Sequence, residues 1–375
     1  MKILFVADHL KGNSGWSRYA LDIISAVRKE GVEVLCLVYE LAPETDIPQK
    51  KCLGEPLTYV ANLLRSLISA VQVKRAIREF SPDIIQFIVE PYGTMIPFLR
   101  KGNARIVLNA HSTFAFLPIL VSGIRRTFAT VMTRWTYART DAVIAISRYT
   151  AQYLVRHMTE IHAEQTVKDK ITVMGGGIKL PSVSTEFARP PHIPREILCV
   201  GAVKSRKGIK EALDALVLVK SDFVFHIVGS YRDDDSYVHI LRDKIKEYGL
   251  EKKVILTGQL SDVELNNLYD NADLFLMLST NNGKDFEGYG LVYLEANAHG
   301  IPCIGPKDSG VSDAIVDGKT GYLVNQYDSA AVARTIDHVL NDRPINSADC
   351  LAWAQENSIE NRAKTMMSVY KNIMV

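Results

Sequence analysis

Two glutamates with glycines between them form the stretch of this chain whose residue types could do chemistry. Glu287 and Glu295 bracket the run Glu-Gly-Tyr-Gly-Leu-Val-Tyr-Leu-Glu, which contains Gly290. The apolar run 272–279 predicts a short buried strand, and residues 291–298 suit a helix that ends at a Gly-Ile-Pro sequence. The glycines therefore mark a strand-to-helix turn, with one glutamate on the turn and the other inside the helix.

A helix that begins there would favour a diphosphate, because its first N–H groups are unpaired and its dipole is positive at that end. Leu291 and Val292 would supply amides beside Gly290, and Glu295 follows them by four and three residues on the same helix face. A carboxylate in that place could accept both hydroxyls of a ribose. The stretch therefore predicts a site for a sugar nucleotide.

Composition is that of a globular protein with two domains. The chain has 375 residues, 47% of them hydrophobic and 23% charged. No apolar run approaches the roughly 18–20 residues that span a bilayer, and the first residues enter a strand without the pattern of a signal peptide. The five cysteines are scattered without metal-ligand spacing, so we expect reduced thiols in a cytoplasmic protein.

Charge is unevenly divided although the net charge is only +2. Residues 1–180 carry about 23 Lys and Arg against about 15 Asp and Glu, roughly +8, which leaves roughly −6 for the rest. A basic half beside an acidic half suggests that the first domain meets an anionic partner.

Strand and helix patterns alternate along both halves of the chain. In the first half we expect strands at 2–7, 32–38, 83–89, 104–110 and 142–146, and helices at 16–29, 57–80, 124–138 and 147–158. In the second half we expect strands at 197–201, 223–228, 254–257, 274–278 and 302–304, and helices at 208–219, 236–248 and 262–271. Near-continuous apolar strands between amphipathic helices predict parallel, doubly wound sheets.

The expected architecture is therefore two Rossmann-like domains that face each other across a cleft. Prolines between 181 and 194 suggest the linker, which gives an N-terminal domain at 1–185 and a C-terminal domain at 196–358. A last apolar helix over 359–374 would lack a partner in the second domain. We expect residues 359–375 to cross back and pack on the first.

At these motifs the sequence resembles the retaining glycosyltransferases of family 4, which have the GT-B fold. The Glu–seven residues–Glu signature of that family is matched by Glu287 and Glu295. An alanine-x-glycine-x-proline run is matched at 298–302, and a glycine-x-threonine-glycine-tyrosine-leucine-valine run at 318–324. The resemblance covers essentially the whole chain and is strongest over 197–324.

The resemblance implies a role for each residue of the signature. It puts Glu287 at the donor sugar and Glu295 at the ribose, with the backbone amides near Gly290, Leu291 and Val292 at the diphosphate. It also implies that the base is contacted near Leu260 by backbone, in the run Gly-Gln-Leu.

A basic motif after the first strand of the second domain is implied to stabilise the leaving diphosphate. It stands here as Val-Gly-Ala-Val-Lys-Ser-Arg-Lys-Gly, and contains Arg206 and Lys207. Many relatives have arginine directly after the first glycine, where this chain has Ala202, and Arg206 would take over that role. In the first domain the resemblance implies that Gly15 approaches the donor and that His111 touches the transferred sugar.

Several residues also admit ordinary structural explanations. The two glutamates could be solvated acids, His111 a core residue at a strand end, and Arg206 with Lys207 surface charge. The acids at 233–235 invite a metal hypothesis but are more simply the solvated start of a helix, so we expect no metal. Asp8 and His9 end the first strand and are candidates for the acceptor side; Glu90 and Arg148 stay weaker candidates.

The apolar segment 113–124 is followed by Arg125, Arg126, Arg134 and Arg139. It could cover the core, with an ordinary amphipathic helix after it. Alternatively, its apolar residues could enter the lipid interface while the arginines meet anionic head groups. We expect peripheral contact of the N-terminal domain with the inner face of the cytoplasmic membrane.

Taken with the resemblance, these patterns predict a retaining glycosyltransferase that needs no metal or other cofactor. It would move a hexose from a UDP- or GDP-linked sugar to a lipid-linked or polysaccharide acceptor in bacterial envelope glycan biosynthesis. Two alternatives stay open: a sugar-nucleotide epimerase of the same fold and a non-catalytic sugar-nucleotide-binding protein. No nucleic-acid partner is expected.

Overall fold

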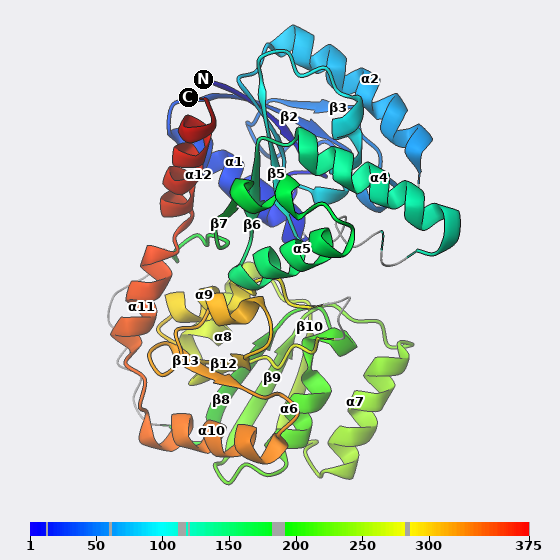
Figure 1. The fold of residues 1–375 in the computed structure, drawn as a ribbon. Coiled ribbons are helices and arrows are strands. Elements are labelled where there is room, and N and C mark those ends of the chain that lie inside the picture. The colour runs from blue at the N-terminus through cyan, green and yellow to red at the C-terminus, as the bar shows by residue number, and fades with distance from the viewer. Residues whose placement is uncertain are drawn as a thin grey trace. The chain divides into compact units, whose positions relative to one another are not determined.

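The computed structural model describes every residue except 13, 60–61, 112–117, 119–120, 182–191, 282–285 and 375. The chain divides into two compact units. Unit 1 comprises Met1–Lys179 with Ile359–Val375, and unit 2 comprises Leu180–Ser358 (Figure 1). The proline-rich segment expected to link two domains lies mostly at 182–191, outside the described residues.

Unit 1 is built on a parallel sheet of seven strands in the order β3-β2-β1-β4-β5-β6-β7. Its strands are β1 (Lys2–Val6), β2 (Glu33–Val38), β3 (Gln49–Lys51), β4 (Ile84–Phe87), β5 (Arg105–Ala110), β6 (Ala142–Ala145) and β7 (Ile171–Val173). The strands β3 and β7, which have only three residues each, were not expected. They form the two edges of the sheet.

Helices connect these strands. They are α1 (Gly15–Lys29), α2 (Leu63–Phe80), α4 (Gly123–Arg139), α5 (Arg148–Glu160) and α12 (Ile359–Met374), with 3-10 segments η1 (Pro56–Tyr59) and η2 (Glu90–Phe98) among the connections. The single helix expected over 57–80 was wrong at its start. Asn62 caps α2 by accepting a hydrogen bond from the Arg65 amide, so the helix begins only at residue 63.

Unit 2 repeats the design with a parallel sheet of six strands in the order β10-β9-β8-β11-β12-β13. Its strands are β8 (Arg195–Val200), β9 (Phe223–Val228), β10 (Val254–Gly258), β11 (Leu274–Leu276), β12 (Cys303–Pro306) and β13 (Gly321–Val324). Its helices are α6 (Ile209–Leu216), α7 (Ser236–Glu247), α8 (Asp262–Asn271), α9 (Leu291–Ala298), α10 (Ser329–Asp342) and α11 (Ser347–Glu356). The fold class expected from the sequence, two doubly wound parallel sheets, is confirmed.

The C-terminal helix α12 packs against α1 and completes the core of unit 1. Its buried Tyr370 donates a hydrogen bond to Gln86 on β4. Gln86 in turn donates to Asn109 on β5 over 2.8 Å, so the buried polar groups are paired as burial requires. The Ile359 amide donates to the carbonyl of Ile178 over 2.8 Å and fixes the start of the helix. Among the described residues, no helix is both long and apolar enough to cross a membrane.

The start of α12 leaves no room for a side chain at Gly177. A Cβ there would lie 2.8 Å from the Cα of Ile359 and 2.8 Å from the Cγ of Arg362. We predict that Gly177→Ala lowers the free energy of unfolding by about 1–3 kcal/mol, because the added methyl group must displace α12. Urea unfolding measures this. Gly15→Ala is the control, because within the described residues no heavy atom other than those of its chain neighbours and of the α1 backbone lies within 4 Å of its added Cβ. Equal stability of the two variants would contradict the prediction.

Candidate active site

The carboxyl ends of β8 and β11 are neighbours in the unit 2 sheet. The chain leaves β8 in one direction, toward β9 and β10, and returns to β11 on its other side. Such a point of reversal is where open parallel sheets bind ligands. Arg206 and Lys207 follow β8, Ser279 follows β11, and Glu287 begins the turn into α9. The fold therefore brings these predicted site residues to one edge of the sheet.

The carboxylate of Glu287 binds both cations. Its Oε2 atom lies 2.6 Å from Lys207 Nζ and 2.9 Å from an Arg206 guanidinium nitrogen. The Ser279 hydroxyl donates to the same oxygen over 3.4 Å. The Thr280 amide donates to the Arg206 carbonyl over 2.8 Å, which ties the basic turn to the loop after β11. Two other segments, the turn after β8 and the loop after β11, therefore converge on one oxygen of Glu287.

This cluster carries more positive than negative charge. Burial by itself raises the pKa of Glu287, but the charges of Lys207 and Arg206 outweigh it and hold that pKa below its ordinary value. The carboxylate is thus ionised at neutral pH and neutralises one of the two cations. One unit of positive charge remains for an anionic ligand, on side chains whose exposed fractions are 36% for Arg206 and 16% for Lys207.

Helix α9 begins beside this charge. Its N-cap residue, Gly290, has φ +85°, a left-handed conformation that favours glycine. A Cβ at Gly290 would lie 2.6 Å from the Tyr293 ring and 3.6 Å from Glu287 Cγ. Because Gly290 has no side chain to cap the helix, the first amides, at Leu291 and Val292, receive no cap from that residue. The expected helix boundaries, 291–298, are confirmed.

Glu295 lies on the next turn of α9, where the Tyr269 hydroxyl donates to its Oε2 over 3.2 Å. Tyr269 comes from α8 and stacks on His299, with ring centroids 5.0 Å apart. Burial and the neighbouring Glu295 charge raise the pKa of Tyr269 well above its ordinary value, so it remains a donor. Glu295 is therefore held by α8, a contact that the sequence alone does not predict.

The residue expected near the base, Leu260, follows the edge strand β10 and precedes Ser261, which caps α8. Gly258, at the end of β10, has φ +74°. Its carbonyl accepts a hydrogen bond from the Gly229 amide over 3.0 Å. Leu260 thus lies at the same carboxyl edge as the basic cluster, two strands away from β8.

A similar point of reversal occurs in unit 1, between β1 and β4. Asp8 follows β1, Glu90 follows β4, and His111 follows β5. The Glu90 side chain is fully buried and accepts hydrogen bonds from the His111 amide over 2.9 Å and the Tyr137 hydroxyl over 3.2 Å. Glu90, a weak candidate from sequence, therefore positions the His111 backbone.

The His111 ring is held in one orientation. Its Nε2 lies 3.1 Å from the carbonyl oxygen of Ile88, so Nε2 carries the proton. The ring packs edge-on against Tyr19 at 5.9 Å. Burial lowers the pKa of His111 to about 4, only partly opposed by the Ile88 hydrogen bond. At neutral pH the imidazole is uncharged.

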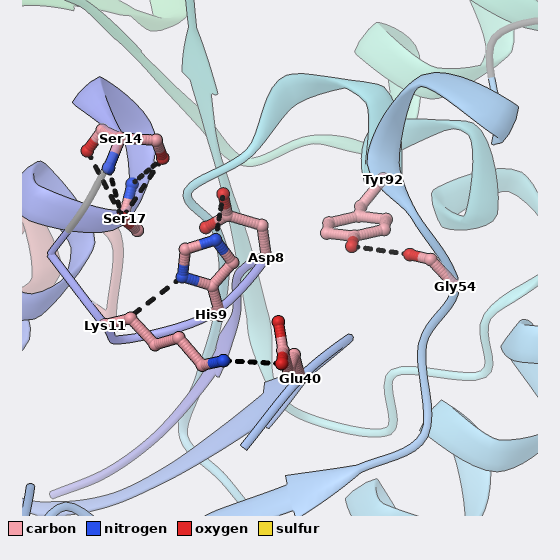
Figure 2. A network of polar contacts seen from close by, with 8 residues as sticks. All are labelled: Asp8, His9, Lys11, Ser14, Ser17, Glu40, Gly54 and Tyr92. Atoms are coloured by element: carbon pink, nitrogen blue, oxygen red, sulfur yellow. Dashed lines mark hydrogen bonds and ion pairs between the residues drawn. The ribbon is translucent and has the colours of Figure 1, made fainter. Parts of the chain in front are cut away.

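Figure 2 shows the polar network beyond β1. His9 Nδ1 accepts from the Lys11 amide over 3.4 Å, and Lys11 pairs with Glu40. His9 Nε2 lies 3.9 Å from Asp8 Oδ2. Burial raises the pKa of Asp8, opposed by the His9 amide and charge. Asp8 Oδ1 has no hydrogen-bond partner within the part of the chain that the structure describes.

Gly15 is the first residue of α1, directly after this network. Ser14 caps the helix: its hydroxyl accepts from the Ser17 amide over 3.2 Å, and the Ser17 hydroxyl accepts from the Ser14 amide over 3.1 Å (Figure 2). Gly15 itself is exposed.

The acidic run suspected of metal binding has a structural explanation. Asp235 caps α7 by accepting from the Tyr237 amide over 2.8 Å, while Asp233 pairs with Arg242 and Asp234 with Arg232. Within the described ranges, no group of three or more His, Cys, Asp or Glu residues is placed to hold a metal ion.

Family models match both halves of the chain. A model described as glycosyltransferase family 4 matches residues 13–180, and one described as glycosyl transferases group 1 matches residues 185–360. The putative colanic acid biosynthesis glycosyltransferase WcaL of Salmonella typhimurium is 30% identical over 169 residues, 44% of this chain. The match spans only 41% of that relative's own length.

Two further comparisons cover more of the chain. The GDP-mannose-dependent alpha-(1-6)-phosphatidylinositol monomannoside mannosyltransferase of Mycolicibacterium smegmatis is 26% identical over 314 residues, 77% of this chain and 76% of that protein. The crystal structure of Anabaena Alr3699/HepE in complex with UDP and glucose has a TM-score of 0.75 at 19% identity, and the match covers 99% of this chain and 100% of that one. The latter likeness shows the GT-B fold.

The neutral, partly buried His111 predicts a specific loss of stability in acid. Its folded pKa of about 4 lies below the ordinary value of 6.5, so between those values the unfolded chain binds a proton that the folded chain does not. The stability that neutral His111 contributes is therefore complete above about pH 6.5 and is lost as the pH falls toward 4, by up to about 3 kcal/mol. In His111→Gln, which keeps a donor for Ile88 but cannot titrate, urea unfolding should lack this component. Parallel pH profiles for the two proteins would contradict the prediction.

Proposed function

Because the chain belongs to glycosyltransferase family 4 (glycosyl transferases group 1), we propose that it transfers a hexose, with retention of configuration, from a nucleotide diphosphate sugar. The acceptor is a lipid-linked or polysaccharide glycan of the bacterial envelope. The observation that carries the proposal is the excess positive charge of Arg206 and Lys207 around Glu287, beside the N-terminus of α9. Both features stabilise the charge that develops on a departing diphosphate.

The donor is held by unit 2 in this proposal. The amides of Leu291 and Val292 bind the diphosphate, Glu295 accepts the ribose hydroxyls, and the backbone near Leu260 contacts the base. Glu287 lies at the sugar. A UDP- or GDP-linked donor is supported by two relatives, one crystallised with UDP and glucose and one that is GDP-mannose-dependent.

The reaction needs little covalent chemistry from the protein. The acceptor hydroxyl attacks from the face that the nucleotide leaves, and the departing diphosphate accepts its proton. Positioning and charge stabilisation are then the main contributions of the chain. Neutral His111 contacts the transferred sugar, and Gly15 lets the α1 backbone approach the donor. The helix dipole and the two cations stabilise the charge that a metal ion would otherwise stabilise, so activity should persist in the presence of a chelator.

The proposed setting is the cytoplasm, at the inner face of its membrane. All five cysteines are free thiols, as expected in a reducing compartment. A lipid-linked acceptor would bring unit 1, the more basic half, into contact with anionic lipid. The names of relatives from colanic acid and phosphatidylinositol mannoside synthesis support an envelope glycan as the product.

We predict that Glu295→Ala weakens the binding of the cognate nucleotide sugar at least about tenfold. It removes charged hydrogen bonds, each worth about 1.5–3 kcal/mol. A thermal-shift panel of UDP, GDP and their sugars identifies the donor, since a ligand at 100 times its dissociation constant adds about 2.7 kcal/mol to stability. Calorimetric titration then compares the variants. Glu247→Ala, an exposed acid on α7, is the control; unchanged binding in Glu295→Ala would exclude the ribose role.

We predict that Lys207→Ala lowers kcat by about 10²–10³, because the leaving diphosphate loses a cation in a partly buried site. Sugar transfer from the identified donor to a lipid or glycan acceptor provides the assay. Lys204→Ala changes an exposed lysine in the same loop and should retain activity. Full activity in Lys207→Ala would contradict the role assigned to this lysine at the leaving diphosphate. If the wild type instead converts the sugar nucleotide to an epimer without an acceptor, the epimerase alternative holds.

A further inference from the structure

Helix α2 turns four of its large apolar side chains toward solvent. Leu64, Leu67, Ile68 and Val71 have exposed fractions of 66%, 39%, 56% and 62%. At 3.6 residues per turn these four lie within an arc of about 100°. They form a continuous apolar stripe on the outside of unit 1.

Two serines lie on the opposite, buried face of α2, which also carries the buried residues Ala70, Val73, Ala76 and Ile77. The hydroxyl of Ser66 bonds that of Thr94 over 2.8 Å, and the hydroxyl of Ser69 bonds that of Tyr59 over 2.7 Å. A rotation that buried the stripe would break these bonds and leave buried hydroxyls without partners, which is costly. The outward orientation of the stripe is therefore fixed by the buried face, where the two serines are paired and Val73 and Ile77 are packed.

Helix α4 presents a second stripe of the same kind. Ile124, Phe128, Val131 and Trp135 are all exposed, Ile124 to 88%. They fall within an arc of about 60° around the helix. Both α2 and α4 pack against η2 (Figure 1). We call the two stripes together the α2–α4 surface.

The charges that accompany these stripes are almost all positive. Every charged residue of α4 is an arginine, and Arg125 and Arg126 are exposed. On α2, Arg75 and Arg78 continue the line of the stripe toward the helix C-terminus. The one acid of α2, Glu79, is already bonded by Lys50 and Arg75.

We propose that the α2–α4 surface docks unit 1 on an anionic lipid bilayer, with the apolar stripes in the interface and the arginines at the head groups. The proposal rests on the function proposed above. It adds α2 to the arginines of α4 that were suspected from sequence, whereas most of the suspected apolar segment 113–124 lies outside the described residues. Charge complementarity favours lipid over a second copy of the chain. A symmetric pairing of this surface would bring its arginines against one another.

The test is co-sedimentation of the full chain with vesicles, without donor or acceptor. The vesicles are phosphatidylcholine alone, or with about a third phosphatidylglycerol. We expect binding to the anionic vesicles that weakens as salt rises from about 0.1 M to about 1 M, because surface charge is then screened. Leu64→Ser/Val71→Ser and Ile124→Ser/Phe128→Ser should each lower the partition coefficient at least about tenfold. Arg125→Glu/Arg126→Glu should do the same on anionic vesicles.

The matched control is Ile240→Ser/Val263→Ser, which changes two exposed apolar residues on α7 and α8 of unit 2 and should bind like the wild type. Circular dichroism and nucleotide thermal shifts establish that all variants are folded.

Equal binding by the stripe variants and the control would overturn the proposal, as would a wild-type protein that stays in the supernatant. A wild-type dimer in light scattering that the stripe variants abolish would assign the surface to a second copy instead. Nucleotide binding that persists when lipid binding fails would leave the proposed function intact.

Discussion

The ionised carboxylate of Glu287 is the constraint on which the unit 2 site depends. An ionised carboxylate with only 13% of its side chain exposed is stable only when paired. Its two cations come from the turn after β8, and its third contact comes from the loop after β11. Removing one cation would still leave the acid paired. Removing the acid would leave Lys207 and Arg206 without the carboxylate oxygen that lies 2.6 Å and 2.9 Å from them. The two cations would then repel each other, and an anionic ligand would relieve that repulsion.

That constraint requires the backbones of different loops to approach closely. The Gly310 amide donates to the Glu287 carbonyl over 2.9 Å, and a Cβ at Gly310 would stand 1.9 Å from the Gly288 carbonyl oxygen. A side chain there would push away the turn that carries Glu287. On the opposite side of that turn, Tyr293 donates its hydroxyl to the Met277 carbonyl over 2.6 Å and holds α9 on the sheet. The glutamate is thus positioned by packing on both sides before any ligand arrives.

The sequence was sufficient for the two parallel sheets and for α9, because apolar strands, amphipathic helices and turn glycines are local signals. It could not supply the edge strands β3, β7 and β13, which have only three or four residues each, or α10 and α11, which no site motif marked. The pairing of both cations with one oxygen of Glu287 could not be predicted either, because these residues are about 80 positions apart in the sequence. The same holds for Tyr269 beside Glu295 and for Glu90 beneath His111. Each of these contacts depends on which strands become neighbours.

The orientation of α2 shows why a periodic pattern alone is insufficient. A period of 3.6 residues identifies a stripe but does not say whether the stripe faces the core. Here α2 has apolar residues on both faces, and Val73 and Ile77 are buried. The exposed stripe lies opposite the face on which Ser66 and Ser69 find partners in Thr94 and Tyr59. Those partners come from η1 and η2, whose 3-10 turns were not expected. The positive charge of the first half, visible in the composition, acquires a location only in the fold, which places basic and apolar residues of α2 and α4 on solvent-facing surfaces of unit 1.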